Sequence, residues 1–259
     1  MIDMHSHIVF DVDDGSDSLE ESLAIIKRAS KKGIHTMFAT SHYIEGSMTA
    51  KANAVKDKLE ILRSKLKEEH IDVQLLCGHE VFLDHESIDH VKSGKALSLN
   101  DSRYILVELP MLNELNNLED ILFDMTIKGY VPIIAHPERY TYVQRDINRI
   151  RKWIDSGALL QLNLPSFHNK YGDVARKTAE EMLKRQMYHF VGSDVHAYKS
   201  RALSIDDPLN KVKSLVSNSV YMDMIENNPK KVIQNDSIEP FDILELKPSF
   251  FKKMKKLIG

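Results

Sequence analysis

The sequence has a single cysteine and no long apolar run. Because Cys77 has no partner among the 259 residues, an internal disulfide is excluded and a reducing compartment is favoured. No basic and apolar leader precedes the first motif, and no apolar stretch approaches the roughly 18 residues of a membrane span. We therefore expect a cytoplasmic protein.

The charge is also without a strong bias. The formal net charge is -3, with 35 Lys and Arg against 38 Asp and Glu. Basic residues do not gather around the motifs described below, so we do not expect nucleic acid as a partner. With 42% hydrophobic residues, the chain can bury one large core.

Short apolar runs alternate with segments of helical periodicity. Expected strands are residues 1–7, 33–42, 73–80, 104–110, 130–139, 158–166 and 188–196, with a weaker eighth at 219–225. Expected helices are residues 18–32, 51–69, 118–128, 147–156 and 174–185, the first capped by Asp17 or Ser18. This order predicts an α/β fold of parallel strands with right-handed crossovers.

Six of the seven clear strands end in residues that can bind a metal ion. These residues are His5 and His7, His42, Glu80, Glu108, His136, and Asp194 with His196. In the first strand, MIDMHSH, alternation is expected to place Asp3, His5 and His7 on one face. In a parallel barrel, the strand ends meet at one mouth, where barrel enzymes keep their chemistry. Asp14 in the following loop can reach the same mouth, although the neighbouring acids at 11, 13 and 17 are alternatives.

These side chains comprise five imidazoles and four carboxylates, which are too many for one ion and require two or three. A set without thiolate favours manganese, iron(II) or zinc. Three divalent ions would leave a net positive pocket after the four carboxylates are counted, which suits a dianion such as a phosphate monoester. Each histidine taken alone has the simpler interpretation of a core or surface residue.

Five motifs, in this order, resemble the polymerase and histidinol phosphatase (PHP) superfamily of metal-dependent phosphoesterases. They are D-x-H-x-H at 3–7, S-H at 41–42, G-x-E at 78–80, H-P-E-R at 136–139 and S-D-x-H at 193–196. The flanking sequences FATSHY, DSRYILVELP, GYVPIIAHPERY and VGSDVHAYKSR look like those of bacterial protein-tyrosine phosphatases encoded with capsule and exopolysaccharide genes. The resemblance covers residues 1 to about 201.

This resemblance implies a distorted TIM-like (β/α)7 barrel of the PHP type over residues 1–246. It also implies three metal ions, with Mn²⁺ foremost and Fe²⁺ or Zn²⁺ as alternatives. Glu80 would bridge two ions. The implied groups are His5, His7 and Asp194 at the first ion, Glu108 and His136 at the second, and Asp14, His42 and His196 at the third. The implied substrate is a phosphotyrosine protein, a tyrosine autokinase of polysaccharide synthesis.

The expected mechanism is attack on phosphorus by a hydroxide that bridges metal ions. Cys77 precedes no C-x5-R loop, so a thiol-dependent mechanism is not expected. Arg139 and Arg201 are expected to bind phosphate oxygens. The alternatives are a salt bridge from Arg139 to Glu138 or Asp146, and a surface role for Arg201. Phenolate is a ready leaving group, so a dedicated general acid is less necessary.

The C-terminal segment 247–259 has five lysines, no acid and apolar residues at helical spacing. It predicts a basic amphipathic tail that contacts an anionic membrane surface or an acidic partner, with a peripheral location at the inner face of the membrane. The alternative is a terminal helix packed on the barrel. Two other functions stay open at this point: a small-molecule phosphatase, such as one for histidinol phosphate, and a non-hydrolytic module that binds metal or phosphoprotein.

Overall fold

The computed structural model describes residues 1–199 and 203–245. Arg201 and the basic segment 247–259 lie outside these residues. Within the described part of the chain, no helix is both long enough and apolar enough to cross a membrane.

Seven parallel strands form one sheet in sequence order, β1 to β7. They are β1 (Ile2–Ser6), β2 (Thr36–Tyr43), β3 (Gln74–Phe82), β4 (Tyr104–Glu108), β5 (Val131–Ala135), β6 (Leu159–Asn163) and β7 (Phe190–Gly192). The first and last strands approach each other, because His7 N donates to Val195 O at 2.9 Å and Ser6 bridges to Val195. The sheet is therefore a nearly closed barrel, and the expected (β/α)7 architecture is confirmed.

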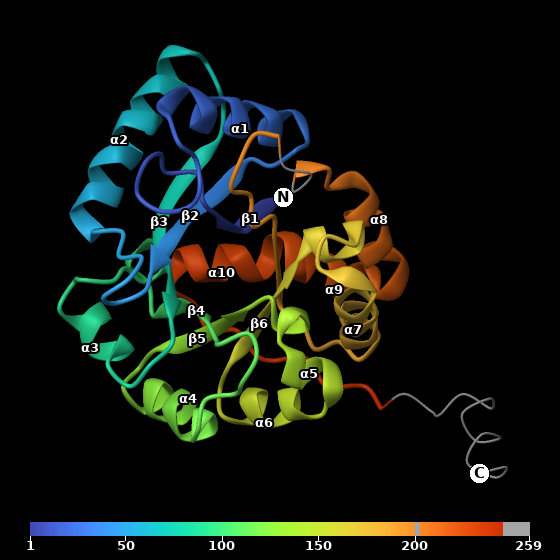
Figure 1. Ribbon diagram of the computed structural model, residues 1–259. Helices are drawn as coiled ribbons and strands as arrows, with labels where there is room; N and C mark the ends of the chain where they lie inside the picture. Colours follow the sequence, from blue (N-terminus) through green and yellow to red (C-terminus); the bar gives the residue numbers. More distant parts are fainter. Residues whose placement is uncertain (200–202, 246–259) are drawn as a thin grey trace, which may run out of the picture.

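Helices surround the strands (Figure 1). They are α1 (Leu19–Lys31), α2 (Ala52–Glu68), α3 (Ser87–Lys92), α4 (Leu118–Ile127), α5 (Thr141–Arg145), α6 (Arg149–Asp155), α7 (Gly172–Lys184), α8 (Asp206–Leu215), α9 (Asn218–Met222) and α10 (Asn228–Gln234). Short helical turns are η1 (Leu99–Asp101), η2 (Pro137–Arg139), η3 (Leu164–His168) and η5 (Asp223–Asn227).

The five expected helices are confirmed, but the weaker eighth strand at 219–225 is wrong. This segment continues from α9 into the π-helical turn η5. Its start is fixed by Ser217, whose side chain accepts a hydrogen bond from Val220 N at 3.2 Å. The cap and the helical continuation override the β propensity of its valine and tyrosine.

The first helix shows why these segments fold where they do. Ser18 caps α1 by accepting a hydrogen bond from Glu21 N at 3.2 Å, which settles the choice between the two expected caps. Leu23, Ile26 and Ala29 follow at helical spacing and are all buried. The helix therefore packs one apolar face against the outside of the sheet, and its start leaves residues 7–17 as a loop above the strand ends.

The apolar core has two layers. One lies between the strands and the outer helices, and the other fills the barrel interior with residues such as Met4, Phe38 and Leu106. Val232 of α10 belongs to the interior layer, and Asn235, just beyond this helix, accepts from Arg103 N at 2.9 Å immediately before β4. Helix α10, which crosses the centre of Figure 1, therefore covers the end of the barrel where the strands begin. The opposite end carries the polar strand ends.

Candidate metal centre and active site

A bulge in β1 aims its two histidines into the barrel mouth. Asp3 pairs with Met37 and Ser6 pairs with Ala39, so the register shifts between these pairs. The shift breaks strict alternation, and Asp3 pairs with a residue of the outer layer. It accepts hydrogen bonds from Ser193 N at 2.8 Å and from Ser193 Oγ at 2.6 Å. The expectation that Asp3 shares a face with the histidines is therefore wrong.

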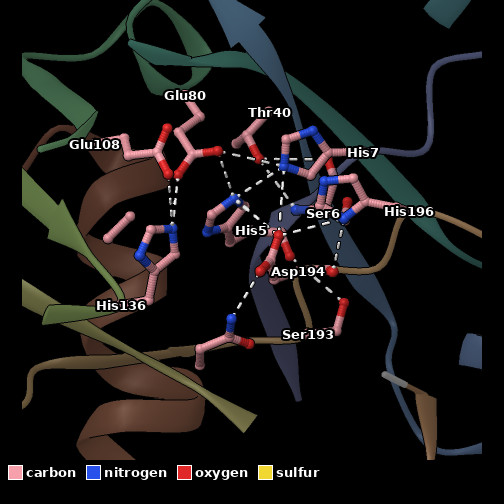
Figure 2. Close-up of polar contacts among 12 residues, drawn as sticks. His5, Ser6, His7, Thr40, Glu80, Glu108, His136, Ser193, Asp194 and His196 are labelled. Atoms are coloured by element: carbon pink, nitrogen blue, oxygen red, sulfur yellow. Dashed lines mark hydrogen bonds and ion pairs between the residues drawn. The ribbon is translucent and has the colours of Figure 1, made fainter. Parts of the chain in front are cut away.

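Glu80, two residues before the end of β3, reaches His5, His7 and His136 across the mouth (Figure 2). Its Oε2 atom lies 3.1 Å from His5 Nε2, 3.4 Å from His7 Nε2 and 3.2 Å from His42 Nδ1. Its Oε1 atom lies 3.0 Å from His136 Nε2. One carboxylate thus faces four histidines from three sequence motifs.

The other predicted metal ligands surround this centre. Asp194 Oδ1 lies 3.5 Å from the Nε2 atoms of both His5 and His7. Glu108 Oε1 lies 3.6 Å from His136 Nε2. Asp14 Oδ1 lies 3.5 Å from His196 Nε2 and 3.6 Å from His42 Nε2. The structure therefore brings all nine predicted ligands into one cluster.

Three subsets of this cluster have ligand atoms that all lie within 4.8 Å of one another. They are His5, His7 and Glu80; His42, Glu80 and Glu108; and His7, Asp14, His42 and His196. Glu80, His7 and His42 each belong to two subsets, so the cluster is continuous.

Two residues of the cluster have left-handed backbone conformations. His136, directly after β5, has φ of 34°, and Asp194, after β7, has φ of 49°. Such conformations are costly for residues other than glycine and occur preferentially at functional sites. Asp194 N donates to His5 O at 2.8 Å, which holds this turn against β1.

Charge sets the protonation of the centre. Burial would lower the pKa of His5, but Glu80 and Asp194 outweigh burial and raise this pKa to about 9. Burial and the charge of Glu80 raise the pKa of Glu108 to about 8. Burial and the nearby Arg139 lower the pKa of His136 to about 4. In the absence of metal ions, the pKa values of His5 and Glu108 are thus raised and that of His136 is lowered.

The donor set fits divalent metal ions. His7 Nδ1 must donate to Asp13 Oδ2 at 2.9 Å, because a carboxylate only accepts, and His5 Nδ1 lies 3.0 Å from Gln161 Oε1. The amide of Gln161 is oriented by its bond from Nε2 to Leu162 O, so Oε1 faces the ring. The two remaining Nε2 atoms lie 3.1 Å apart at the mouth, where each neutral ring would offer its Nε2 lone pair to a cation. Outer hydrogen bonds of this kind orient metal-binding imidazoles.

Arg139 lies at the mouth and contacts neither partner that the sequence offered as a salt bridge. Its Nη1 atom lies 3.2 Å from Asp194 Oδ2, and its guanidinium lies 4.3 Å from the ring centre of Tyr171. Glu138 is instead buried, where it accepts from Ser166 Oγ at 2.7 Å. The side chain of Arg139 is 22% exposed, so part of it remains open to the mouth.

Sequence reasoning missed residues that hold the predicted ligands. Gln161 contacts His5, and Asn163 Nδ2 donates to Asp194 Oδ2 at 2.7 Å. Both side chains come from β6, the strand that has no acid or histidine at its end. Their alternation in LLQLN was the available signal, because it places two polar residues on the interior face of a buried strand.

Comparison with known proteins finds one matching family model and several curated relatives. Residues 1–234 match the family model described as capsular polysaccharide synthesis, CpsB/CapC. Tyrosine-protein phosphatase CpsB of Streptococcus pneumoniae is 30% identical over 92% of this chain and 100% of its own length. Tyrosine-protein phosphatase YwqE of Bacillus subtilis (strain 168) is 30% identical over 92% of this chain and 93% of its own.

Solved structures give the same grouping. A structure from a study of YwqE from Bacillus subtilis and CpsB from Streptococcus pneumoniae, described as metal-dependent tyrosine phosphatases, matches with a TM-score of 0.87. The match has 28% identity and covers 95% of this chain and 100% of the other. Histidinol phosphate phosphatase from Lactococcus lactis matches at 15% identity with a TM-score of 0.54, over 83% of this chain and 93% of its own, and shows a shared fold.

Proposed function

The chain belongs to the capsular polysaccharide synthesis family CpsB/CapC, and from this premise we propose that it is a metal-dependent protein-tyrosine phosphatase. The observation that carries the proposal is the approach of His5 Nε2 and His7 Nε2 to 3.1 Å beside the carboxylate of Glu80. Such a site binds cations, and a cluster of cations binds a phosphate dianion. The relatives named tyrosine-protein phosphatase support a phosphotyrosine protein as the substrate.

We assign the metal ligands to three groups, and Glu80 would bridge two of the ions. The groups are His5, His7 and Asp194; Glu108 and His136; and Asp14, His42 and His196. Two of the three subsets of close ligand atoms support this division, because one holds His5 and His7 and another holds Asp14, His42 and His196. The third subset joins Glu108 to His42, and we assign Glu108 with His136 because Glu108 Oε1 lies 3.6 Å from His136 Nε2. A nitrogen and oxygen donor set without sulfur suits Mn²⁺ first, with Fe²⁺ or Zn²⁺ as alternatives.

Bound divalent ions would supply a water nucleophile at neutral pH and offset the charge of the phosphate. The chain's own contribution is to orient the phosphate. Arg139, stacked on Tyr171 and partly exposed, would bind phosphate oxygens through N–H groups that do not face Asp194. Arg201 stays a predicted second phosphate ligand. A dedicated general acid is less necessary for a tyrosyl phenolate, because the pKa of tyrosine is near 10.

The protein substrate that we propose is a tyrosine autokinase of capsule or exopolysaccharide synthesis. The family description supports the polysaccharide context. A cytoplasmic location stays a prediction, as do the domain boundary at residue 246 and contact of the segment 247–259 with a membrane surface.

The proposal is tested by hydrolysis of a phosphotyrosyl peptide in the presence of Mn²⁺, with a phosphoseryl peptide and histidinol phosphate as parallel substrates. We expect selective release of phosphate from phosphotyrosine, abolished by a chelator and by His136→Ala. The matched control is His70→Ala, because His70 is exposed and also has a left-handed backbone, with φ of 53°. This control makes the same change at a similar backbone position away from the cluster.

Two results would overturn the proposal. Turnover of histidinol phosphate alone would indicate a small-molecule phosphatase. The absence of turnover in a metal-loaded protein would leave a binding module.

A further inference from the structure

Asp13 and Asp14 are adjacent acids in the loop between β1 and α1, but their surroundings differ. The side chain of Asp13 is fully buried, whereas that of Asp14 is 51% exposed. We propose that Asp13 is a positioning residue that sets the orientation of His7 and His42, while Asp14 supplies an oxygen to the metal. This inference rests on the metal centre proposed above.

The Asp13 carboxylate is occupied by protein donors at both oxygens. Its Oδ2 atom accepts from His7 Nδ1 at 2.9 Å and from His42 N at 2.9 Å, and its Oδ1 atom accepts from Gly15 N at 3.0 Å. Among the described residues, no hydrogen bond occupies the Asp14 carboxylate, whose Oδ1 atom faces the Nε2 atoms of two histidines. The geometry therefore gives the two neighbours different tasks.

The loop is built tightly around this contact. A Cβ atom at Gly15 would lie 2.3 Å from His7 O and 2.9 Å from Asp13 Oδ1, so no larger residue fits there without movement. Ser16 N also donates to His7 O at 3.1 Å. The carboxylate of Asp13 is held in place from its own loop as well as from the residues that it orients.

One Asp13 oxygen controls two residues that join the metal groups. His7 and His42 each belong to two of the three subsets of close ligand atoms. Accepting the proton on His7 Nδ1 leaves the Nε2 lone pair directed at the cluster, and holding His42 N fixes the end of β2. Loss of this carboxylate should weaken metal binding without removing a ligand.

The change that isolates this role is Asp13→Asn. The amide has one accepting oxygen for three N–H donors, so its NH₂ group must face either Gly15 N or the pair formed by His7 Nδ1 and His42 N. In both orientations the proton on His7 Nδ1 is no longer held by a charged acceptor, so the other tautomer of His7 becomes populated. We expect the variant to bind the same number of Mn²⁺ ions, with affinity lower by about 10- to 100-fold. The control is Asp17→Asn, an exposed acid of the same loop. Free Mn²⁺ measured by electron paramagnetic resonance gives both affinity and stoichiometry.

A second readout uses the wild-type protein loaded with Zn²⁺, which is diamagnetic. Long-range ¹⁵N–¹H spectra should show the proton of His7 on Nδ1, and the Asp13→Asn spectrum should show it partly on Nε2. A proton on Nε2 in the wild type would overturn the proposal even if the variant does not fold.

The outcomes separate the two proposals. Unchanged affinity in Asp13→Asn beside normal binding by the wild type overturns the positioning role alone. Loss of one ion from the stoichiometry would make Asp13 a ligand and also overturn it. A wild-type protein that binds no metal would refute the proposed function and this inference together.

Discussion

Two kinds of buried histidine lie on opposite faces of the same sheet. His79 and His189 face the outer layer, and each accepts a backbone N–H at Nδ1, from Leu97 N at 3.0 Å and from Leu160 N at 3.1 Å. Burial lowers the pKa of each to about 3. His5 is equally buried in the barrel mouth, but its pKa is raised to about 9 because carboxylates outweigh the effect of burial.

The comparison teaches that burial alone does not mark a functional histidine. Each structural ring accepts one backbone N–H and faces no carboxylate of residues 1–199 and 203–245 in hydrogen-bond contact, whereas the ring of His5 faces Glu80 and Asp194. His136 refines this rule, because it lies in the mouth yet has a pKa lowered to about 4 by burial and Arg139. In the absence of metal ions, the pKa of one imidazole of the mouth is therefore raised and that of another is lowered, according to burial and to the charges that each ring faces.

The largest expected effect comes from removing the carboxylate of Glu80, which distinguishes the barrel mouth from the surroundings of the outer histidines. In Glu80→Gln, we expect the pKa of His5 to fall toward those of the outer histidines. Metal affinity should fall by more than the roughly 100-fold typical of losing an outer hydrogen-bond partner. Metal content and phosphatase activity after dialysis against Mn²⁺ check this. Glu20→Gln, at an exposed position of α1, is the control and should behave like wild type. Full metal occupancy in Glu80→Gln would contradict the central role of this residue.

A smaller effect is expected from Arg139→Lys, which keeps the charge but loses the planar fork. Since a hydrogen bond to a charged group contributes about 1.5–3 kcal/mol, kcat/KM for a phosphotyrosyl peptide should fall by roughly 10- to 100-fold. Metal content should not change. An unaltered kcat/KM would leave Arg139 as a partner of Asp194 only, while loss of metal would make it a structural support of the centre.

The low pKa values of the outer histidines predict that the metal-free protein is less stable in acid. The pKa of His189 is about 3 in the folded protein and near 6.5 when unfolded, so the unfolded state binds the proton first as pH falls. Its contribution to stability is complete above pH 6.5 and is lost as pH falls toward 3, by about 1.4 kcal/mol for each pH unit. Urea unfolding of the chelated protein at pH 7 and pH 5.5 measures this.

The variant that sharpens this test is His189→Asn, since an amide oxygen can accept from Leu160 N in place of Nδ1. We expect lower stability at both pH values, because the ring stacks on Phe241 at 5.4 Å, but a smaller difference between them. A difference equal to that of wild type would show that His189 does not titrate on unfolding.

The strand order and the membership of the site could be predicted because both depend on local patterns. Residues such as Glu80 and His136 end apolar runs, and parallel strands bring such ends together. The bulge in β1 could not be predicted, because it depends on pairing with β2 rather than on MIDMHSH itself. For the same reason, the contact of Arg139 with Asp194, 55 residues away, was missed.

Helix α10 has a consequence for turnover. Val232 and the apolar side chains of the interior layer fill the barrel below the polar strand ends, so the substrate cannot pass through the barrel. If the chain is the phosphatase that we propose, the liberated phosphate leaves by the same opening through which the next phosphotyrosine enters. Product and substrate then share one opening, and inorganic phosphate is expected to inhibit the reaction.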